Sequence, residues 1–197
     1  MAASTPPAPE TQVYTVSIAL ALLSLLLILL ILPPLIWHAR NRNPGATSLV
    51  AWILLLLSFT FVKALIWPSD DISTWFSGVG LCDIEVRVQV ASQVAIPASF
   101  AAVLRGLAKV LDTENATLGI TKAQRRRNLV VDLLFCVGAP VVQVGFFEVV
   151  HSKRYAIDGI AGCTPAVSDS WVTVLLLTIP PLLWTILDAF YAGKPLH

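Results

Sequence analysis

The chain has 197 residues, of which 56% are hydrophobic and only 13% are charged. Its mean hydropathy of +0.78 is too high for a water-soluble globular domain, so the composition indicates a membrane protein. The net charge is +1 and the basic residues are divided among separate loops, which excludes a nucleic-acid-binding protein. Three cysteines are too few for a disulfide scaffold, and their spacing is not that of a zinc site or any other metal site.

Five apolar segments are long enough to cross a bilayer, which takes about 20 residues. The third is rich in Ala, Ser and Gln, which suits a helix buried among other helices. The sequence therefore predicts an all-α membrane fold, a bundle of five transmembrane helices preceded by an extracellular tail and followed by a short cytoplasmic end. The tail is 1–12, the spans are about 13–37, 47–67, 84–108, 128–150 and 170–192, and the end is 193–197.

Basic residues between the spans predict the orientation, because Lys and Arg in short loops stay on the cytoplasmic side. Eight of them follow the first and third spans, whereas the loop after the fourth holds only Lys153 and Arg154. The N-terminus is therefore expected outside. Cys82 and Cys163 then both lie outside, where oxidising conditions permit a disulfide, and Cys136 lies within the fourth span as a small buried side chain.

Nothing in the sequence indicates an enzyme or a cofactor. The histidines are His38, His151 and His197, and the chain lacks the local motifs of metalloproteases, hydrolases and phosphate-binding loops. A small transporter or channel subunit is a weaker alternative, because such proteins are expected to show internal repeats or charges near the middle of the membrane. Here the charges lie close to the ends of the spans.

Several short sequence strings lie at the boundaries of the spans. No single string identifies a family, but their order along the chain is characteristic. They are Trp37–Asn43 (WHARNRN), Gly78–Ile84 (GVGLCDI), Arg105–Asp112 (RGLAKVLD), Arg125–Arg127 through Asp132–Leu134 to Gly138–Pro140, Arg154–Tyr155, and Gly162–Ala166 (GCTPA) followed by Ser170–Trp171. In these strings the chain resembles the fungal mating receptors that sense farnesylated peptide pheromones, the a-factor type of class D G-protein-coupled receptor.

The resemblance implies a multi-pass plasma-membrane receptor whose partners are a lipidated peptide pheromone outside, a heterotrimeric G protein inside and membrane lipid around it. It leaves assembly into receptor oligomers open. The five spans correspond to helices 1–5 of a seven-helix receptor, so we expect a chain truncated after the fifth helix. The alternative to a signalling receptor is accordingly a non-signalling receptor fragment that binds pheromone, joins full-length receptors or does neither.

Candidate ligand-binding residues lie near the outer ends of the spans. They are Lys63, Trp75, Asp83, Glu85, Arg87 and Glu148. For the charged members, snorkelling or simple pairing is the alternative to a place around the pheromone pocket. For Trp75, the alternative is the aromatic belt of the membrane interface. The resemblance also implies a disulfide between Cys82 and Cys163, with two free thiols as the alternative.

A second candidate set lies on the cytoplasmic side, where it would contact the G protein or anchor the chain to the anionic inner leaflet. Its members are Arg105, Lys109, Lys122, Arg125, Arg126 and Arg127. Asp132, within the fourth span, is expected to be neutralised by the neighbouring arginines or by the helix dipole. Its functional alternative is a polar link to another helix.

Overall fold

The computed structural model describes residues 10–68, 76–111, 121–158 and 162–193. Within these ranges five helical segments are long and apolar enough to cross a membrane, which confirms the predicted five-helix bundle. In chain order they are α1 (Glu10–Arg40), α2 (Pro44–Ile66), α3 (Leu81–Leu111), a fourth segment made of α4 (Lys122–Leu133), the π-helical turn η2 (Leu134–Gly138) and α5 (Ala139–Val150), and finally α6 (Trp171–Gly193).

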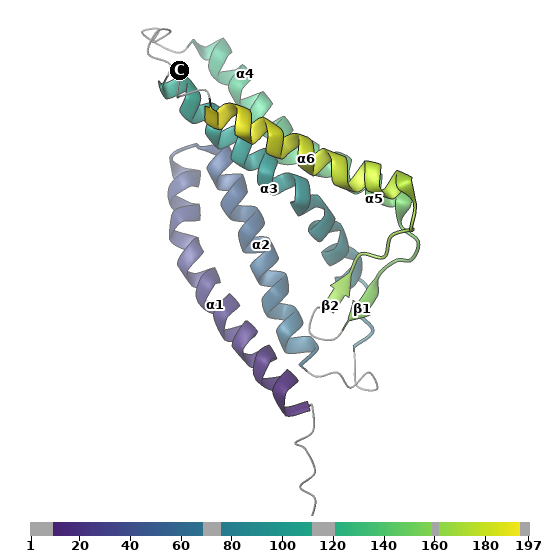
Figure 1. Ribbon diagram of the computed structural model, residues 1–197. Coiled ribbons are helices and arrows are strands. Elements are labelled where there is room, and N and C mark those ends of the chain that lie inside the picture. The colour runs from purple at the N-terminus through teal and green to yellow at the C-terminus, as the bar shows by residue number, and fades with distance from the viewer. Residues whose placement is uncertain (1–9, 69–75, 112–120, 159–161, 194–197) are drawn as a thin grey trace, which may run out of the picture.

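Helix α3 is the centre of the bundle. It contacts α2, α5, η2 and α6, while α1 packs along α2 on one side (Figure 1). The middle of α3 consists of small residues, and Ala95, Ala98, Ser99 and Ala101 are fully buried. Small side chains allow helix backbones to approach closely, so the sequence expectation of a buried third helix holds.

Helices α2 and α3 approach each other closely at Gly45. A Cβ placed on Gly45 would lie 3.1 Å from the Cβ of Ala102 and 3.1 Å from the backbone nitrogen of Val103. Near this contact the hydroxyl of Ser99 donates a hydrogen bond of 3.0 Å to the hydroxyl of Ser48. The inner half of α2 is therefore held against α3 by contact and by a polar bond.

The fourth segment contains a π-helical turn directly before Pro140. The N–H of Ala139 bonds to the carbonyl of Leu134, five residues earlier. Proline has no N–H to offer the carbonyl four residues before it, and its ring would clash with that carbonyl in a regular helix. The wider turn accommodates the proline while the segment continues as one span.

A short antiparallel hairpin connects α5 to α6. Its strands are β1 (Ala156–Asp158) and β2 (Gly162–Thr164), with Ile157 opposite Cys163. The hairpin lies at the end of the bundle where α2 ends and α3 begins, opposite the end where α4 begins (Figure 1). In the orientation predicted from the basic loops, the hairpin end is the outer end, and the two ends are named accordingly below.

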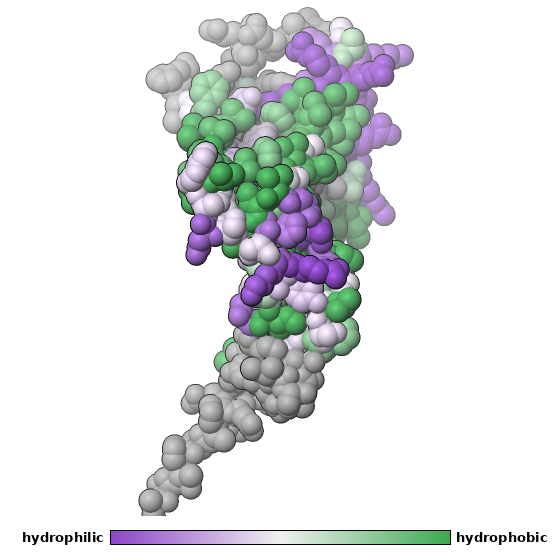
Figure 2. Space-filling view, turned by 90° about the vertical axis from the view of Figure 1, so that its right-hand side faces the viewer, coloured by the Kyte–Doolittle hydropathy of each residue, from purple (hydrophilic) through white to green (hydrophobic). Residues whose placement is uncertain are grey.

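The surface between these ends is apolar. Side chains such as Leu22, Leu30, Val141 and Leu183 are more than half exposed, as expected for helix faces that meet lipid instead of water. Figure 2 shows hydrophobic residues gathered between the hydrophilic residues of the two ends.

The first four helical segments begin three to six residues earlier than the predicted spans, and two of these differences change the place of a candidate residue. Helix α3 begins at Leu81 instead of 84, so Cys82 and Asp83 belong to its first turn. Helix α4 begins at Lys122 instead of 128, with Thr121 and Gln124 forming a capping box. The basic run Arg125–Arg127 is therefore helical and not part of the preceding loop.

We expect the substitution Gly45→Leu to lower the free energy of unfolding by about 2 kcal/mol, because the new side chain must push α2 away from α3. The thermal unfolding temperature in detergent, followed by circular dichroism, measures this effect. Gly145→Leu is the matched control, since a Cβ at Gly145 meets nothing within 4 Å. Equal unfolding temperatures for the two variants would contradict the close packing of α2 on α3.

Candidate functional site

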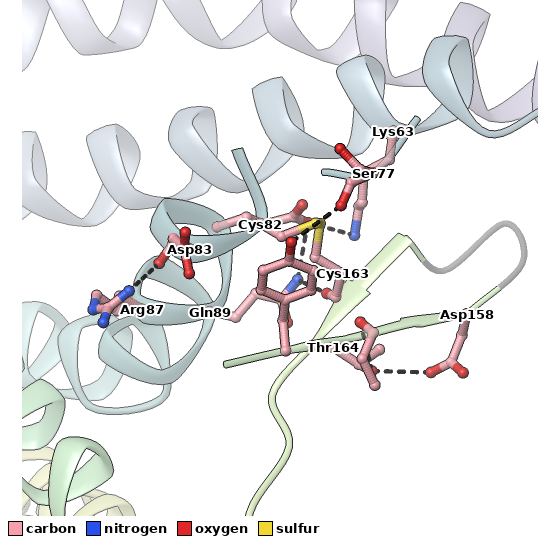
Figure 3. Close-up of a disulfide and its surroundings, with 12 residues drawn as sticks. Lys63, Ser77, Cys82, Asp83, Arg87, Gln89, Asp158, Cys163 and Thr164 are labelled. Atoms are coloured by element: carbon pink, nitrogen blue, oxygen red, sulfur yellow. Dashed lines mark hydrogen bonds and ion pairs between the residues drawn. A yellow bond between two sulfur atoms is a disulfide. The ribbon is translucent and has the colours of Figure 1, made fainter. Parts of the chain in front are cut away.

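The outer end of the bundle is joined to the hairpin by a disulfide. Cys82 in the first turn of α3 is bonded to Cys163 in β2, with their Cα atoms 5.2 Å apart (Figure 3). Both cysteines are fully buried, and they pack in a cluster with Trp67, Val86, Val90 and Phe147. The hairpin is therefore fixed covalently and by packing to the start of the central helix.

A buried ion pair lies beside the disulfide. The ammonium of Lys63, from the last turn of α2, lies 3.0 Å from Oε1 of Glu85 in α3. The Glu85 side chain is fully buried and that of Lys63 is 16% exposed. Gln89, one turn further along α3, donates one hydrogen bond to Glu85 at 2.9 Å and another to the carbonyl of Cys163 at 3.0 Å. This small network connects α2, α3 and β2.

Gly162 makes room for the lysine of this pair. Its φ of +71° is a conformation that side chains other than glycine rarely adopt. A Cβ on Gly162 would lie 2.3 Å from Cδ of Lys63, so the strand backbone passes directly over the lysine stem. The glycine before Cys163 thus permits the close approach of β2 to α2.

Two further ion pairs lie on the exposed side of the same end. Arg154 donates to Asp83 at 2.9 Å and links the start of the hairpin to α3. Arg87 donates to Glu148 at 2.6 Å and links α3 to α5. Arg87 also donates to the carbonyl of Asp83 at 2.7 Å, which places both pairs side by side.

The structure therefore brings together five of the six candidate ligand-binding residues. Lys63 and Glu85 bind each other, Arg87 binds Glu148, and Asp83 binds Arg154. Pairing, the alternative to ligand contact, accounts for all five, and their contact with a ligand stays a prediction. Trp75 lies outside the described residues.

Near the opposite end of α3, Arg105 links this helix to the fourth segment. Arg105 forms an ion pair and hydrogen bond with Asp132 and also donates to the carbonyl of Asn128 at 3.2 Å. Its guanidinium lies over the ring of Phe135. Asp132 is thus bound to another helix, and the expected neutralisation by Arg125–Arg127 is wrong, because those side chains are exposed on the first two turns of α4.

The other members of the cytoplasmic set are placed as follows. Lys122, Arg125, Arg126 and Arg127 are exposed along the start of α4 and form a basic surface there. Lys109 belongs to α3, but its side chain lies outside the described part of the structure. Arg105 differs from the rest because only 13% of its side chain is exposed. It is better placed to join two helices than to contact a partner.

Sequence reasoning missed the roles of Gln89, Arg154 and Gly162. The spacing of Glu85 and Gln89, four residues apart on one helix, was a usable signal, since such residues are neighbours on a helix surface. The contact of Gly162 with Lys63 had no signal in the sequence. Across the described ranges, no three His, Cys, Asp or Glu side chains gather where they could hold a metal ion.

Comparison with known proteins decides the family. Residues 19–197 match the family described as pheromone A receptors. The chain is therefore a member of the pheromone A receptor family. Its relatives include the pheromone a factor receptor of Saccharomyces cerevisiae, 31% identical over 163 residues, and pheromone receptor 1 of Mycosarcoma maydis, 31% identical over 166 residues. A more distant relative is the pheromone M-factor receptor of Schizosaccharomyces pombe, 26% identical over 167 residues.

These matches cover 83%, 83% and 84% of this chain but only 34%, 44% and 44% of the respective relatives. The chain thus spans a third to less than half of the length of these pheromone receptors. No solved structure matches it significantly. Membership of this receptor family and five apolar helices identify a multi-pass membrane protein of the plasma membrane.

We expect Lys63→Met to lower the free energy of unfolding by about 3 kcal/mol, because it leaves the buried Glu85 carboxylate without its counter-ion. The double substitution Lys63→Met with Glu85→Leu should recover most of this loss, since two apolar side chains need no partner. Thermal unfolding of purified protein measures both. Arg87→Met is the control for an exposed pair and should cost at most about 1 kcal/mol. A double variant as unstable as Lys63→Met would contradict the importance of the pair.

Proposed function

We propose that this chain forms part of a G-protein-coupled receptor that binds a farnesylated peptide pheromone at its outer end and activates a heterotrimeric G protein at its inner end. The observation that carries the proposal is the match to pheromone A receptors over residues 19–197. The two ends of the bundle differ in a way that suits these two tasks.

At the outer end, burial separates the candidate ligand-binding residues into two groups. The Lys63–Glu85 pair is enclosed, so it positions α2, α3 and the hairpin. The Arg87 and Glu148 side chains are 44% and 39% exposed, so a peptide can reach them without unfolding the hairpin. Arg154, 74% exposed, is also accessible. We assign pheromone contact to this exposed group, with the farnesyl chain held by apolar helix faces.

At the inner end, the basic surface at the start of α4 is the proposed G-protein contact. Arg126 and Arg127 are exposed, and α4 is capped so that they project from an ordered helix. Arg105 of α3 holds α4 in place through its bonds to Asp132 and to the carbonyl of Asn128. The proposal therefore gives Arg105 a positioning role and the α4 arginines the contact.

The test uses yeast cells that lack their own receptor and carry a pheromone-responsive reporter. The complete reading frame that contains these 197 residues is expressed and challenged with candidate peptides, each with and without a C-terminal farnesyl group. We expect a reporter response to a farnesylated peptide and at least tenfold weaker potency without the farnesyl group. Surface labelling of the expressed receptor must show that it reaches the plasma membrane. With the receptor at the surface, silence toward all farnesylated pheromones would contradict the proposal.

Within the responding receptor, we expect Arg87→Gln to raise the half-maximal pheromone concentration about tenfold, the scale of one lost charge-assisted hydrogen bond. Lys153→Gln is the matched control, because it removes the same charge from an exposed position in the loop between α5 and β1. It should change the half-maximal concentration less than twofold. Equal shifts in the two variants would assign the effect to general surface charge and not to a contact of Arg87.

A further inference from the structure

A cavity of about 740 Å³ lies between the start of α2 and the fourth segment, at the inner end of the bundle. One part of its wall is apolar and contains Ala51, Leu129, Leu133 and Val137. The other part carries two guanidinium groups, those of Arg42 and Arg125. Of the residues in the proposed G-protein contact, Arg125 alone lines this cavity.

The free charges around this cavity are positive, which suits the binding of an anion. Asp132 also lines it, but the Asp132 carboxylate is already bound by Arg105. Neither Arg42 nor Arg125 has an ion-pair or hydrogen-bond partner among the described side chains. Two unpaired cations beside an apolar wall are complementary to a molecule with an anionic head and an apolar chain.

The backbone of Arg42 supports a role beyond connecting two helices. Arg42 has a φ of +53° and is the one non-glycine residue with positive φ in the described ranges. It lies just after the last residue of α1, where the N–H of Asn43 bonds to the carbonyl of His38 and the N–H of Arg42 bonds to the carbonyl of Ala39. Glycine is strongly preferred at this position of the helix-ending motif. An arginine held there against that preference is a reason to look for a function of its side chain.

A second cavity adjoins the first on the side toward the middle of the bundle. It has a volume of about 380 Å³, lies between α2, α3 and α5, and shares Ser48, Cys136 and Val137 with the first. Its further walls are mostly apolar and include Val88, Ala91 and Val144. The two cavities therefore adjoin, so an acyl chain beside Leu133 lies next to a second largely apolar surface.

We propose that this groove is a binding site for an anionic phospholipid of the inner leaflet. Arg42 and Arg125 bind the headgroup, and one acyl chain lies along Leu129, Leu133 and Val137. Anionic lipids are concentrated in the cytoplasmic leaflet, and basic residues near its surface attract them. The site is local, because Arg126 and Arg127 on the same helix do not line the cavity. It does not depend on pheromone binding.

The test measures lipid binding to the purified 197-residue chain in detergent by native mass spectrometry. The probes are dioleoyl phosphatidylserine and, as the zwitterionic comparison, dioleoyl phosphatidylcholine. We expect phosphatidylserine to bind more tightly, and Arg42→Gly and Arg125→Gln each to weaken its binding about fivefold. Arg126→Gln, which removes the same charge from an exposed position outside the cavity, should weaken it less than twofold. None of these variants should change phosphatidylcholine binding.

A folding defect is separated from a binding defect by the choice of Arg42→Gly. Glycine suits the positive φ, so the unfolding temperature should stay the same or rise while phosphatidylserine binding falls. Three outcomes would overturn the proposal. The first is equal affinity for the two lipids, and the second is a loss of phosphatidylserine binding in Arg126→Gln as large as in the other two variants. The third is unchanged lipid binding in Arg42→Gly and Arg125→Gln together with weaker binding of purified G protein, which would make this face a protein contact.

Discussion

The buried carboxylate of Glu85 constrains the whole outer end of the molecule. An ionised group removed from water is very unfavourable unless other groups bind it, so the fold must bring partners to it. Lys63 supplies the opposite charge from α2, and Gln89 supplies a hydrogen bond from α3 itself. The same glutamine amide binds the carbonyl of Cys163, so a partner of this carboxylate also contacts the hairpin that the disulfide holds on α3.

Helix α3 has a charged side chain near each of its ends, and each is paired with an opposite charge on another helix. Glu85 binds α2 near the outer end, and Arg105 binds Asp132 of α4 near the inner end. Between them its buried face is built of alanine, serine and valine, with no charged side chain from Val88 to Leu104. Ion pairs therefore fix the ends of the helix, where water is near, and close packing of small side chains holds its middle, where lipid is the solvent.

The sequence predicted the number, type and approximate limits of the membrane helices, because apolar length alone carries that information. It did not predict which charges meet. Asp132 was expected to be neutralised by arginines five to seven residues before it or by the helix dipole, with a polar link to another helix as the alternative. The alternative holds, and the sequence did not indicate that the partner is Arg105. The rotation of α4 about its own axis decides which residue Asp132 faces, and the sequence alone does not determine that rotation. The partner of Lys63 was undetermined for the same reason, although its position near a span end was correct.

Pro140 and Gly162 are two further positions where the sequence indicates a special residue but not its structural role. Pro140 predicted an irregularity in the fourth span. The π-helical turn before it and the continuity of the segment depend on local hydrogen bonds that the sequence does not show. Gly162 belongs to the string Gly162–Ala166, but nothing in that string indicates a contact with Lys63. Its importance becomes visible only when Lys63 is found beneath it.

The arrangement of the outer ion pairs has a consequence for how a ligand can act. Asp83 receives Arg154 from the hairpin, and its carbonyl also receives Arg87, which in turn binds Glu148 at the end of α5. A peptide group that binds Arg154 or Arg87 must compete with these carboxylates. Because the disulfide and the Lys63–Glu85 pair hold the hairpin in place, such competition changes the contacts between α3 and α5 without releasing the loop. The exposed pairs are thus the adjustable contacts, and the buried network is the fixed frame around which they exchange partners.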